Sequence, residues 1–154
     1  MRLAALAPAV VGASVFSGAL TNALAAAGLE PYAVHGDAVP APLAGLAGDA
    51  ARGRAIVLDR RRGNCLICHE LPVEGEPFQG ELGPPLAGVG SRLGPGQLRL
   101  RLIDQSRLNP DTIMPPYYRV EGLDAVAAEY RGLPALDAQA IEDVVAYLET
   151  LREP

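Results

Sequence analysis

The stretch that decides the fold is Cys65-Leu66-Ile67-Cys68-His69, which contains the only two cysteines and one of the two histidines of the chain. Its Cys-x-x-Cys-His spacing is the attachment signature of c-type haem. Two thiols three positions apart can reach the two vinyl groups along one edge of a porphyrin and form thioether bonds with both. His69 is then held beneath the ring, where its imidazole can bind iron as the proximal ligand. We therefore expect one haem c, attached covalently to Cys65 and Cys68.

Three other uses of this motif fit less well. A structural zinc site needs four ligands, usually in two separated pairs, and the distant His35 is the only further histidine. A thioredoxin-type redox pair would need a βαβ pattern around it, and none is visible. A disulfide between Cys65 and Cys68 would close too small a loop to stabilise the chain much. Haem attachment remains the favoured interpretation.

The distal ligand of the iron can be sought by elimination, because haem iron accepts His, Met, Cys or Tyr side chains. Both cysteines are used as thioethers, and Met1 lies in a segment that we expect to be removed. Met114 is followed by Pro115 and Pro116, which fix φ, remove backbone donors and stiffen the loop. Such a loop can hold the Met114 thioether against iron. His35, a tyrosine or an open position are the alternatives to Met114.

Composition places the chain among globular proteins and excludes one class of partner. The 154 residues are 49% apolar and 20% charged, which suits one domain with an added arm. Aromatic residues make up only 5%, so we expect the haem to fill part of the core. All 13 basic residues are arginine, and the net charge is −5. This charge disfavours nucleic-acid binding, and the chain cannot build the lysine ring through which many soluble electron carriers dock.

Residues 1–27 have the pattern of a secretory signal peptide. Arg2 forms a short positive region, residues 3–20 are apolar and rich in alanine, and Ala23-Leu24-Ala25 offers a cleavage site of small residues. An uncleaved membrane anchor is the alternative. Covalent haem attachment in bacteria takes place outside the cytoplasm, so both features predict a periplasmic protein without a membrane span after cleavage.

The remaining chain predicts an all-α protein: an extended N-terminal arm and a single small haem domain. The arm, residues 28–47, is rich in Pro, Ala and Gly and should lack regular structure. His35 should lie on its surface. The haem domain covers residues 48–154.

Two helices of this domain are well marked. Asp49 should cap a helix that runs to about Arg60, in which Gly53 is out of place unless another helix crosses closely there. Asp137 should cap the last helix, where Tyr147 can fill the notch beside Gly53. The apolar stripe of the last helix consists of Ile141, Val144, Val145, Leu148 and Leu151.

The middle of the domain is less regular. Residues 70–96 are predicted to be loop, with a carbonyl of Gly83-Pro84-Pro85-Leu86 available to the ring N–H of His69. Residues 97–106 fit either a strand or a helix, and we favour helix. Residues 123–131 predict a short helix closed by Gly132. Three arginines around the ambiguous segment are expected on the surface, with one available to a haem propionate: Arg99, Arg101 and Arg107.

These elements together resemble the cytochrome c fold over residues 49–152. A narrower resemblance is to SoxX, the family of sulfur-oxidation cytochromes. The segments that carry it are Gly48–Val57, Gly63–Pro72, Gly83–Leu86, Asn109–Arg119 and Val144–Leu148.

The resemblance implies the monohaem subunit of a SoxAX heterodimer, an L-cysteine S-thiosulfotransferase of the periplasm. That complex joins thiosulfate oxidatively to a cysteine of the carrier SoxYZ. The implied partners are a SoxA-like dihaem or monohaem subunit, SoxYZ, and a small soluble cytochrome c that receives the electrons. By position, Cys65 and Cys68 attach the haem, His69 is the proximal ligand and Met114 the distal one.

The residues of the chain limit its part in that reaction. After haem attachment no free cysteine remains, so the catalytic cysteine-ligated haem is expected on the partner chain. A His/Met-ligated iron favours accepting electrons over binding substrate. We expect an exposed haem edge beside residues 115–118, unless these residues only pack the loop. A free-standing periplasmic electron-transfer cytochrome c is the alternative function, and a haem-based ligand sensor would need an open sixth position. The long arm favours a bound subunit.

Overall fold

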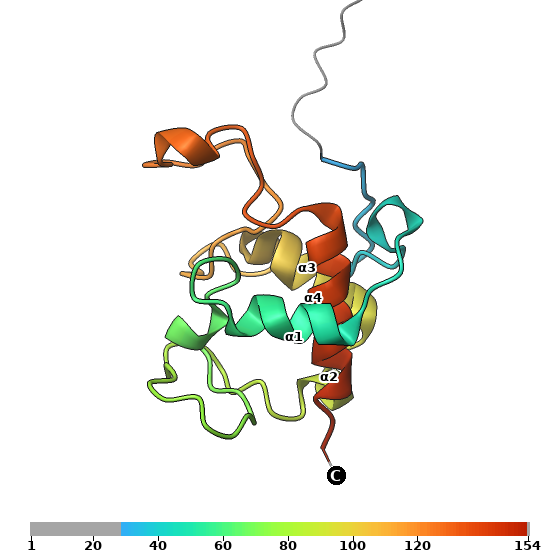
Figure 1. Cartoon of the computed structure of the whole chain (residues 1–154). Helices are drawn as coiled ribbons and strands as arrows, with labels where there is room; N and C mark the ends of the chain where they lie inside the picture. The colour runs from blue at the N-terminus through green and yellow to red at the C-terminus, as the bar shows by residue number, and fades with distance from the viewer. Residues whose placement is uncertain (1–28, 154) are drawn as a thin grey trace, which may run out of the picture.

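The computed structural model describes residues 29–153, so the predicted signal peptide lies outside the described part. Four α-helices form the domain: α1 (Ala50–Leu58), α2 (Val89–Arg92), α3 (Pro95–Asp104) and α4 (Ala138–Thr150). Short 3₁₀ turns occur at Leu43–Gly45, Cys65–Ile67, Gln105–Arg107 and Ala128–Tyr130. Over residues 29–153 the only β-pairing is an isolated bridge between His35 and Ala38. The all-α prediction is confirmed (Figure 1).

Both of the well-marked helices begin where the sequence predicts. The Asp49 side chain accepts a hydrogen bond from the backbone N–H of Arg52 at 2.8 Å, which caps α1. The Asp137 side chain caps α4 in the same way, by accepting from the N–H of Ala140 at 2.8 Å. Each carboxylate satisfies an N–H that the first helical turn leaves without a partner.

The two helices cross at Gly53 (Figure 1). A Cβ atom built at Gly53 would lie 1.9 Å from the carbonyl oxygen of Asp143 and 2.9 Å from the Cβ atom of Tyr147. Only glycine allows this approach, which explains a residue that weakens the helix by propensity. The predicted crossing, with Tyr147 beside Gly53, is confirmed.

The core lies between α4, α1 and α3. Four of the five stripe residues of α4 are buried, and Leu151 at its end is half-buried. The ambiguous segment 97–106 is helical, as favoured, and it is buried nearly all round. Its buried apolar residues are Leu98, Leu100, Leu102 and Ile103. A helix enclosed on several sides carries no clear one-sided stripe, which accounts for the strand-like alternation in its sequence.

One arginine expected on the surface belongs to the core. Arg99 is 3% exposed, and its guanidinium donates two hydrogen bonds of 2.7 Å to the Glu142 carboxylate. A third, also of 2.7 Å, goes to the carbonyl of Val39. The surface prediction for Arg99 is therefore wrong, because α4 and the arm supply its partners from distant parts of the chain. Arg107 is exposed and Arg101 partly exposed, as predicted.

The N-terminal arm has little regular structure, as predicted, yet it packs on its own domain. Val39 and Leu43 are each 1% exposed. The N–H of Val39 donates to the carbonyl of Gly96 at 2.9 Å, and the N–H of Leu43 donates to the Glu142 carboxylate at 2.9 Å. Since the domain itself uses these arm residues, the arm by itself no longer favours a bound subunit over a free shuttle.

Two predictions about the middle segments need correction. The helix predicted over residues 123–131 is wrong: a single 3₁₀ turn, Ala128–Tyr130, forms there, and Ala125 has a positive φ of 55° that interrupts a helix. This segment projects from the body of the molecule, where it has no core to pack against (Figure 1). The predicted loop 70–96 contains the short helix α2, in which Gly90 approaches the end of α4.

Candidate haem site

The Cys-x-x-Cys-His motif follows α1 and begins with a 3₁₀ turn, Cys65–Ile67. The N–H of Cys68 donates to the carbonyl of Cys65 at 3.1 Å, and the N–H of His69 donates to the same oxygen at 2.9 Å. Residues three apart in a 3₁₀ turn lie on the same side, so the two cysteines are presented together. Leu66 between them is fully buried and fixes the turn to the core. Both thiols are free and half-buried.

The His69 ring is held by a backbone contact. Its Nδ1 lies 2.8 Å from the carbonyl oxygen of Pro84. A carbonyl can only accept, so Nδ1 carries the hydrogen and Nε2 is left as the metal-binding nitrogen. This confirms the prediction that residues 83–86 supply an acceptor to His69. Such a bond fixes the ring orientation and increases the basicity of the ligand.

Gly83 is the second residue that shapes the proximal side. A Cβ at this position would lie 2.4 Å from Cε1 of His69. The N–H of Gly83 also donates to the carbonyl of Cys68 at 2.7 Å, so the loop is bonded directly to the motif. The loop therefore forms a close-fitting support for the imidazole, and only glycine fits against the ring.

The loop that carries Met114 is bonded through Tyr117 to the segment just before the motif. The Tyr117 hydroxyl donates to the carbonyl of Gly63 at 2.8 Å. Met114 is half-buried and packs against the core, as Cys65 does. Tyr117 and Tyr118 are 9% and 0% exposed, so these two side chains pack the loop. The exposed haem edge expected beside residues 115–118 stays a prediction. The sequence pattern alone did not reveal the Tyr117 contact.

The electrostatics of Cys65 argue against a role as a nucleophilic or redox-active thiol. Burial raises the pKa of the Cys65 thiol to about 11. At neutral pH this thiol is protonated, whereas nucleophilic and redox-active cysteines have lowered pKa values. Cys65 is therefore poorly suited to thiolate chemistry.

The structure supports neither His35 as the distal ligand nor a structural zinc site. His35 is exposed in the arm, as predicted. Within residues 29–153 no group of three or more His, Cys, Asp or Glu side chains could hold a metal ion. No helix in this part of the chain has the length and apolar character needed to cross a membrane.

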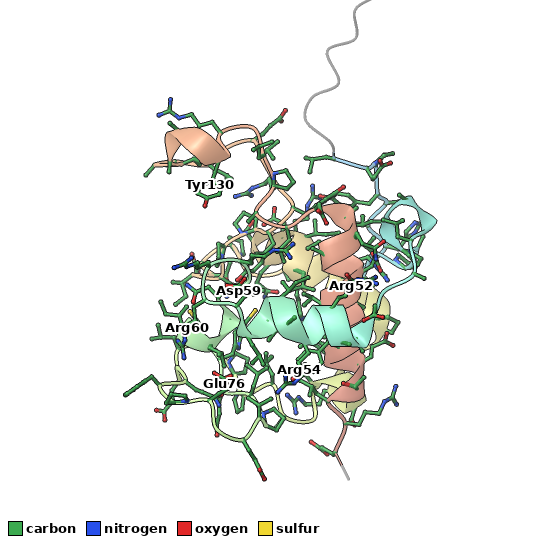
Figure 2. The ribbon with its side chains drawn as sticks, in the orientation of Figure 1. Arg52, Arg54, Asp59, Arg60, Glu76 and Tyr130 are labelled. Carbon is green, nitrogen blue, oxygen red and sulfur yellow. The ribbon has the colours of Figure 1, made fainter. Side chains whose placement is uncertain are left out.

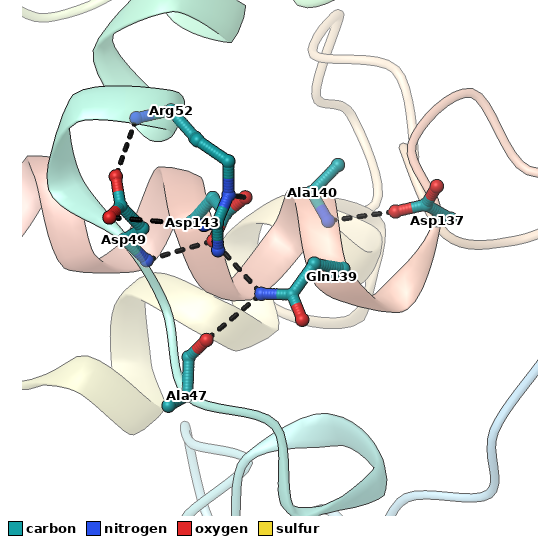
Figure 3. Close-up of polar contacts among 7 residues, drawn as sticks. All are labelled: Ala47, Asp49, Arg52, Asp137, Gln139, Ala140 and Asp143. Atoms are coloured by element: carbon teal, nitrogen blue, oxygen red, sulfur yellow. Dashed lines mark hydrogen bonds and ion pairs between the residues drawn. The ribbon is translucent and has the colours of Figure 1, made fainter.

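A cleft of about 340 Å³ lies between α1 with the residues that follow it and the N-terminal end of α4, and its central charged groups, Arg52 and Asp143, are paired with each other. Arg52 donates two hydrogen bonds of 2.7 Å to Asp143. Gln139 donates to both Asp143 and the carbonyl of Ala47, each at 2.9 Å (Figure 3). This network ties the end of the arm to α1 and α4, which is a structural role.

Comparison with known proteins agrees with this geometry. A family model described as cytochrome c matches residues 50–152, and the chain belongs to the cytochrome c family. Among solved structures, a chain in the crystal structure of SoxXA from P. pantotrophus matches with a TM-score of 0.74 and 35% identity. The match covers 79% of this chain and 95% of that one. The predicted resemblance to SoxX is confirmed. No curated protein sequence matches.

The family carries covalently bound haem c, and the described residues fit this group. The two free cysteines lie on one side of a turn. His69 has a fixed ring orientation, and its Nε2 atom is free to bind iron. Gly83 leaves room for that ring where a larger residue would displace it. The chain is an electron-transfer cytochrome of the SoxX kind with one haem c.

Proposed function

We propose that this chain is the monohaem electron-transfer subunit of a SoxXA-type L-cysteine S-thiosulfotransferase. The observation that carries the proposal is the match to a chain of the SoxXA crystal structure over 95% of that chain's length. In the proposed reaction, thiosulfate forms an S–S bond with a carrier cysteine of a SoxYZ-like protein. This bond formation releases one proton and two electrons. With haem bound, this chain would accept the electrons one at a time and pass them to a small soluble cytochrome c.

The proposed ligand set is Cys65 and Cys68 as thioethers, His69 as proximal ligand and Met114 as distal ligand. When bound, the haem supplies a one-electron redox centre. The Pro84 carbonyl holds His69 in the tautomer that leaves Nε2 for the iron. A methionine ligand raises the reduction potential and fills the last position. With His69 and Met114 as ligands, the chain would exchange electrons and leave no site for thiosulfate at the iron.

The bond-forming chemistry belongs to the partner in this proposal. The only two cysteines of the chain hold the haem, so neither can accept sulfur or serve as a thiolate ligand. A SoxA-like subunit supplies the catalytic cysteine-ligated haem. The signal peptide proposed for residues 1–27 delivers the chain to the periplasm, where both subunits and the carrier meet.

A free-standing periplasmic electron-transfer cytochrome c is the second candidate. The observation in its favour is that Val39 and Leu43 of the arm are buried on their own domain. Under this alternative the arm completes the fold and makes no contact with a partner.

Co-purification separates the two candidates. The tagged mature protein is isolated from the periplasm of its native host after growth on thiosulfate, and the captured chains are stained for haem. A second haem-bearing chain in equal amount supports the subunit. A lone monomeric haem protein contradicts it and leaves the free shuttle.

A further inference from the structure

The loop after the haem motif, Glu70–Leu82, presents one aromatic side chain to solvent. Phe78 is 90% exposed, more than any other large apolar side chain in the described part of the chain. Its φ of 57° lies in the left-handed region, which bulky residues rarely adopt. Strained residues of this kind persist only where the surrounding structure holds them. The contacts on both sides of Phe78 therefore decide its orientation.

Before Phe78, the loop is held by Arg60, which follows the end of α1. The Arg60 guanidinium donates a hydrogen bond of 2.8 Å to the carbonyl of Pro77, the residue directly before Phe78. Figure 2 shows Arg60 and Glu76 on the same side of the molecule, beyond the end of α1.

After Phe78, the loop is held by Gln79 and Gly80. The Gln79 carboxamide accepts from the N–H of Leu71 at 2.6 Å, which closes the loop on itself. The N–H of Gly80 donates to the carbonyl of Leu66 inside the haem motif at 2.8 Å. Both neighbours of Phe78 are thus fixed, and Phe78 faces outward because the loop holds it there.

The charge of this loop defines the partner. Residues 70–82 contain four carboxylates and no basic residue. These carboxylates are Glu70, Glu74, Glu76 and Glu81, and all but the half-buried Glu76 are exposed. Within the loop the exposed Phe78 is flanked by carboxylates, and the exposed Arg60 stands beside it at Pro77. An apolar centre with a charged rim matches the usual anatomy of a transient interface. Carboxylates complement lysines and speed the encounter of opposite charges.

We propose that the loop Glu70–Leu82 is the docking surface for a small, lysine-rich cytochrome c that takes electrons from this chain. Phe78 packs on the apolar part of the carrier's haem face, and the carboxylates pair with the surrounding lysines. The Gly80–Leu66 hydrogen bond places the surface directly against the haem-bearing motif. In the transfer step one electron passes from the ferrous haem of this chain to the ferric haem of the carrier, and no bond forms or breaks. The inference rests on the proposed function for the identity of the acceptor.

Stopped-flow electron transfer tests this surface. Reduced holoprotein is mixed with oxidised lysine-rich small cytochrome c over a range of salt concentrations. The double variant Glu74→Lys/Glu76→Lys should lower the second-order rate constant at low salt by about tenfold or more and flatten its salt dependence. Phe78→Gly, which also relieves the positive φ, should lower the rate several-fold at every salt concentration and leave the salt dependence in place.

The matched control is Glu121→Lys/Asp124→Lys. Both residues are exposed and lie outside the loop Glu70–Leu82, and the change in net charge is the same. The control should change the rate by less than about twofold. An equal loss in the control, or an unchanged rate in the loop variants, overturns the proposal.

Loss of a co-purifying haem chain in the loop variants, with an unchanged transfer rate, also overturns it, because the loop would then face the catalytic partner. The rate is measured on the isolated holoprotein, so failure here is distinct from failure of the proposed function, which co-purification alone decides.

Discussion

The Nδ1 atom of His69 donates a hydrogen bond of 2.8 Å to the carbonyl oxygen of Pro84. This contact depends on Gly83, since a Cβ there would lie 2.4 Å from the imidazole ring. Gly83→Ala should therefore displace the ring and weaken the bond. A less basic imidazole stabilises ferric iron less, so the reduction potential of the holoprotein should rise. Redox titration measures this change.

Gly94→Ala is the control for this substitution. Gly94 precedes α3, and a Cβ there would have 3.8 Å to its nearest neighbour. This variant should keep the wild-type potential, and its stability should fall by about 1 kcal/mol or less, because Gly94 is the N-cap of α3 and alanine is a poorer cap. An unaltered potential in Gly83→Ala would show that the Pro84 contact does not tune the iron.

Met114→Ala tests the distal ligand. The variant should keep its covalent haem, because the thioethers are formed by Cys65 and Cys68. The ferric protein should lose the weak far-red absorption band of methionine ligation, and its potential should fall. It should also bind added imidazole at least about tenfold more tightly, since no thioether competes for the iron. His35→Ala should retain the band. A wild-type protein without the band, whose affinity for imidazole rises in His35→Ala and not in Met114→Ala, would instead assign the ligand to the arm.

The buried pair of Arg99 and Glu142 should be a major source of stability only while both partners are present. Arg99→Met leaves the Glu142 carboxylate buried without its cation and should lower the free energy of unfolding by about 3–5 kcal/mol. Arg99→Met/Glu142→Met should recover much of that loss. Denaturant unfolding of the holoprotein measures both. The partly exposed Arg101→Met serves as control and should change stability by about 0.5 kcal/mol or less.

Asp143 should make folding depend on pH in the acid range. Burial by itself raises the pKa of Asp143, but hydrogen bonds from Arg52, the Asp49 amide and Gln139 outweigh it and hold the pKa below its ordinary value. Because its pKa is lower in the folded state, Asp143 stabilises the fold at pH values above its unfolded pKa of about 3.9. This contribution to the free energy of unfolding is lost as the pH falls through the folded-state pKa.

Asp143→Asn removes that proton-linked contribution. Its free energy of unfolding should therefore decline less steeply than that of the wild type as the pH is lowered below about 4. Chemical denaturation at a series of pH values gives both slopes. If the free energy of unfolding depends on pH in the same way in both proteins, the pKa of Asp143 is the same in the folded and unfolded states, which contradicts this prediction.

The haem motif, the two capped helices and the Pro84 acceptor could be predicted because each depends on short-range spacing. A Cys-x-x-Cys-His run, a capping Asp and a Gly-Pro turn have a meaning within a few residues. The crossing at Gly53 could also be predicted, since a glycine inside a helix needs a reason. For the ligand set as a whole, the predicted roles of Cys65, Cys68, His69 and Met114 remain predictions.

Arg99 and the segment 123–131 could not be predicted in this way, because their structures depend on distant residues. The partner of Arg99 is Glu142, which lies 43 positions later in the chain. Only the position of Arg99 between the buried Leu98 and Leu100 indicated that it is buried. Residues 123–131 have suitable helix propensity, but no part of the core covers them. Propensity is a weak determinant where packing is absent.

Thiosulfate-dependent reduction of the haem on this chain tests the central claim most directly. The oxidised holoprotein is combined with its SoxA-like partner and a SoxYZ carrier, and its visible spectrum is followed after thiosulfate is added. The account predicts that this haem becomes reduced only when partner, carrier and thiosulfate are all present. A haem that stays oxidised while the carrier acquires its thiosulfonate group would contradict it.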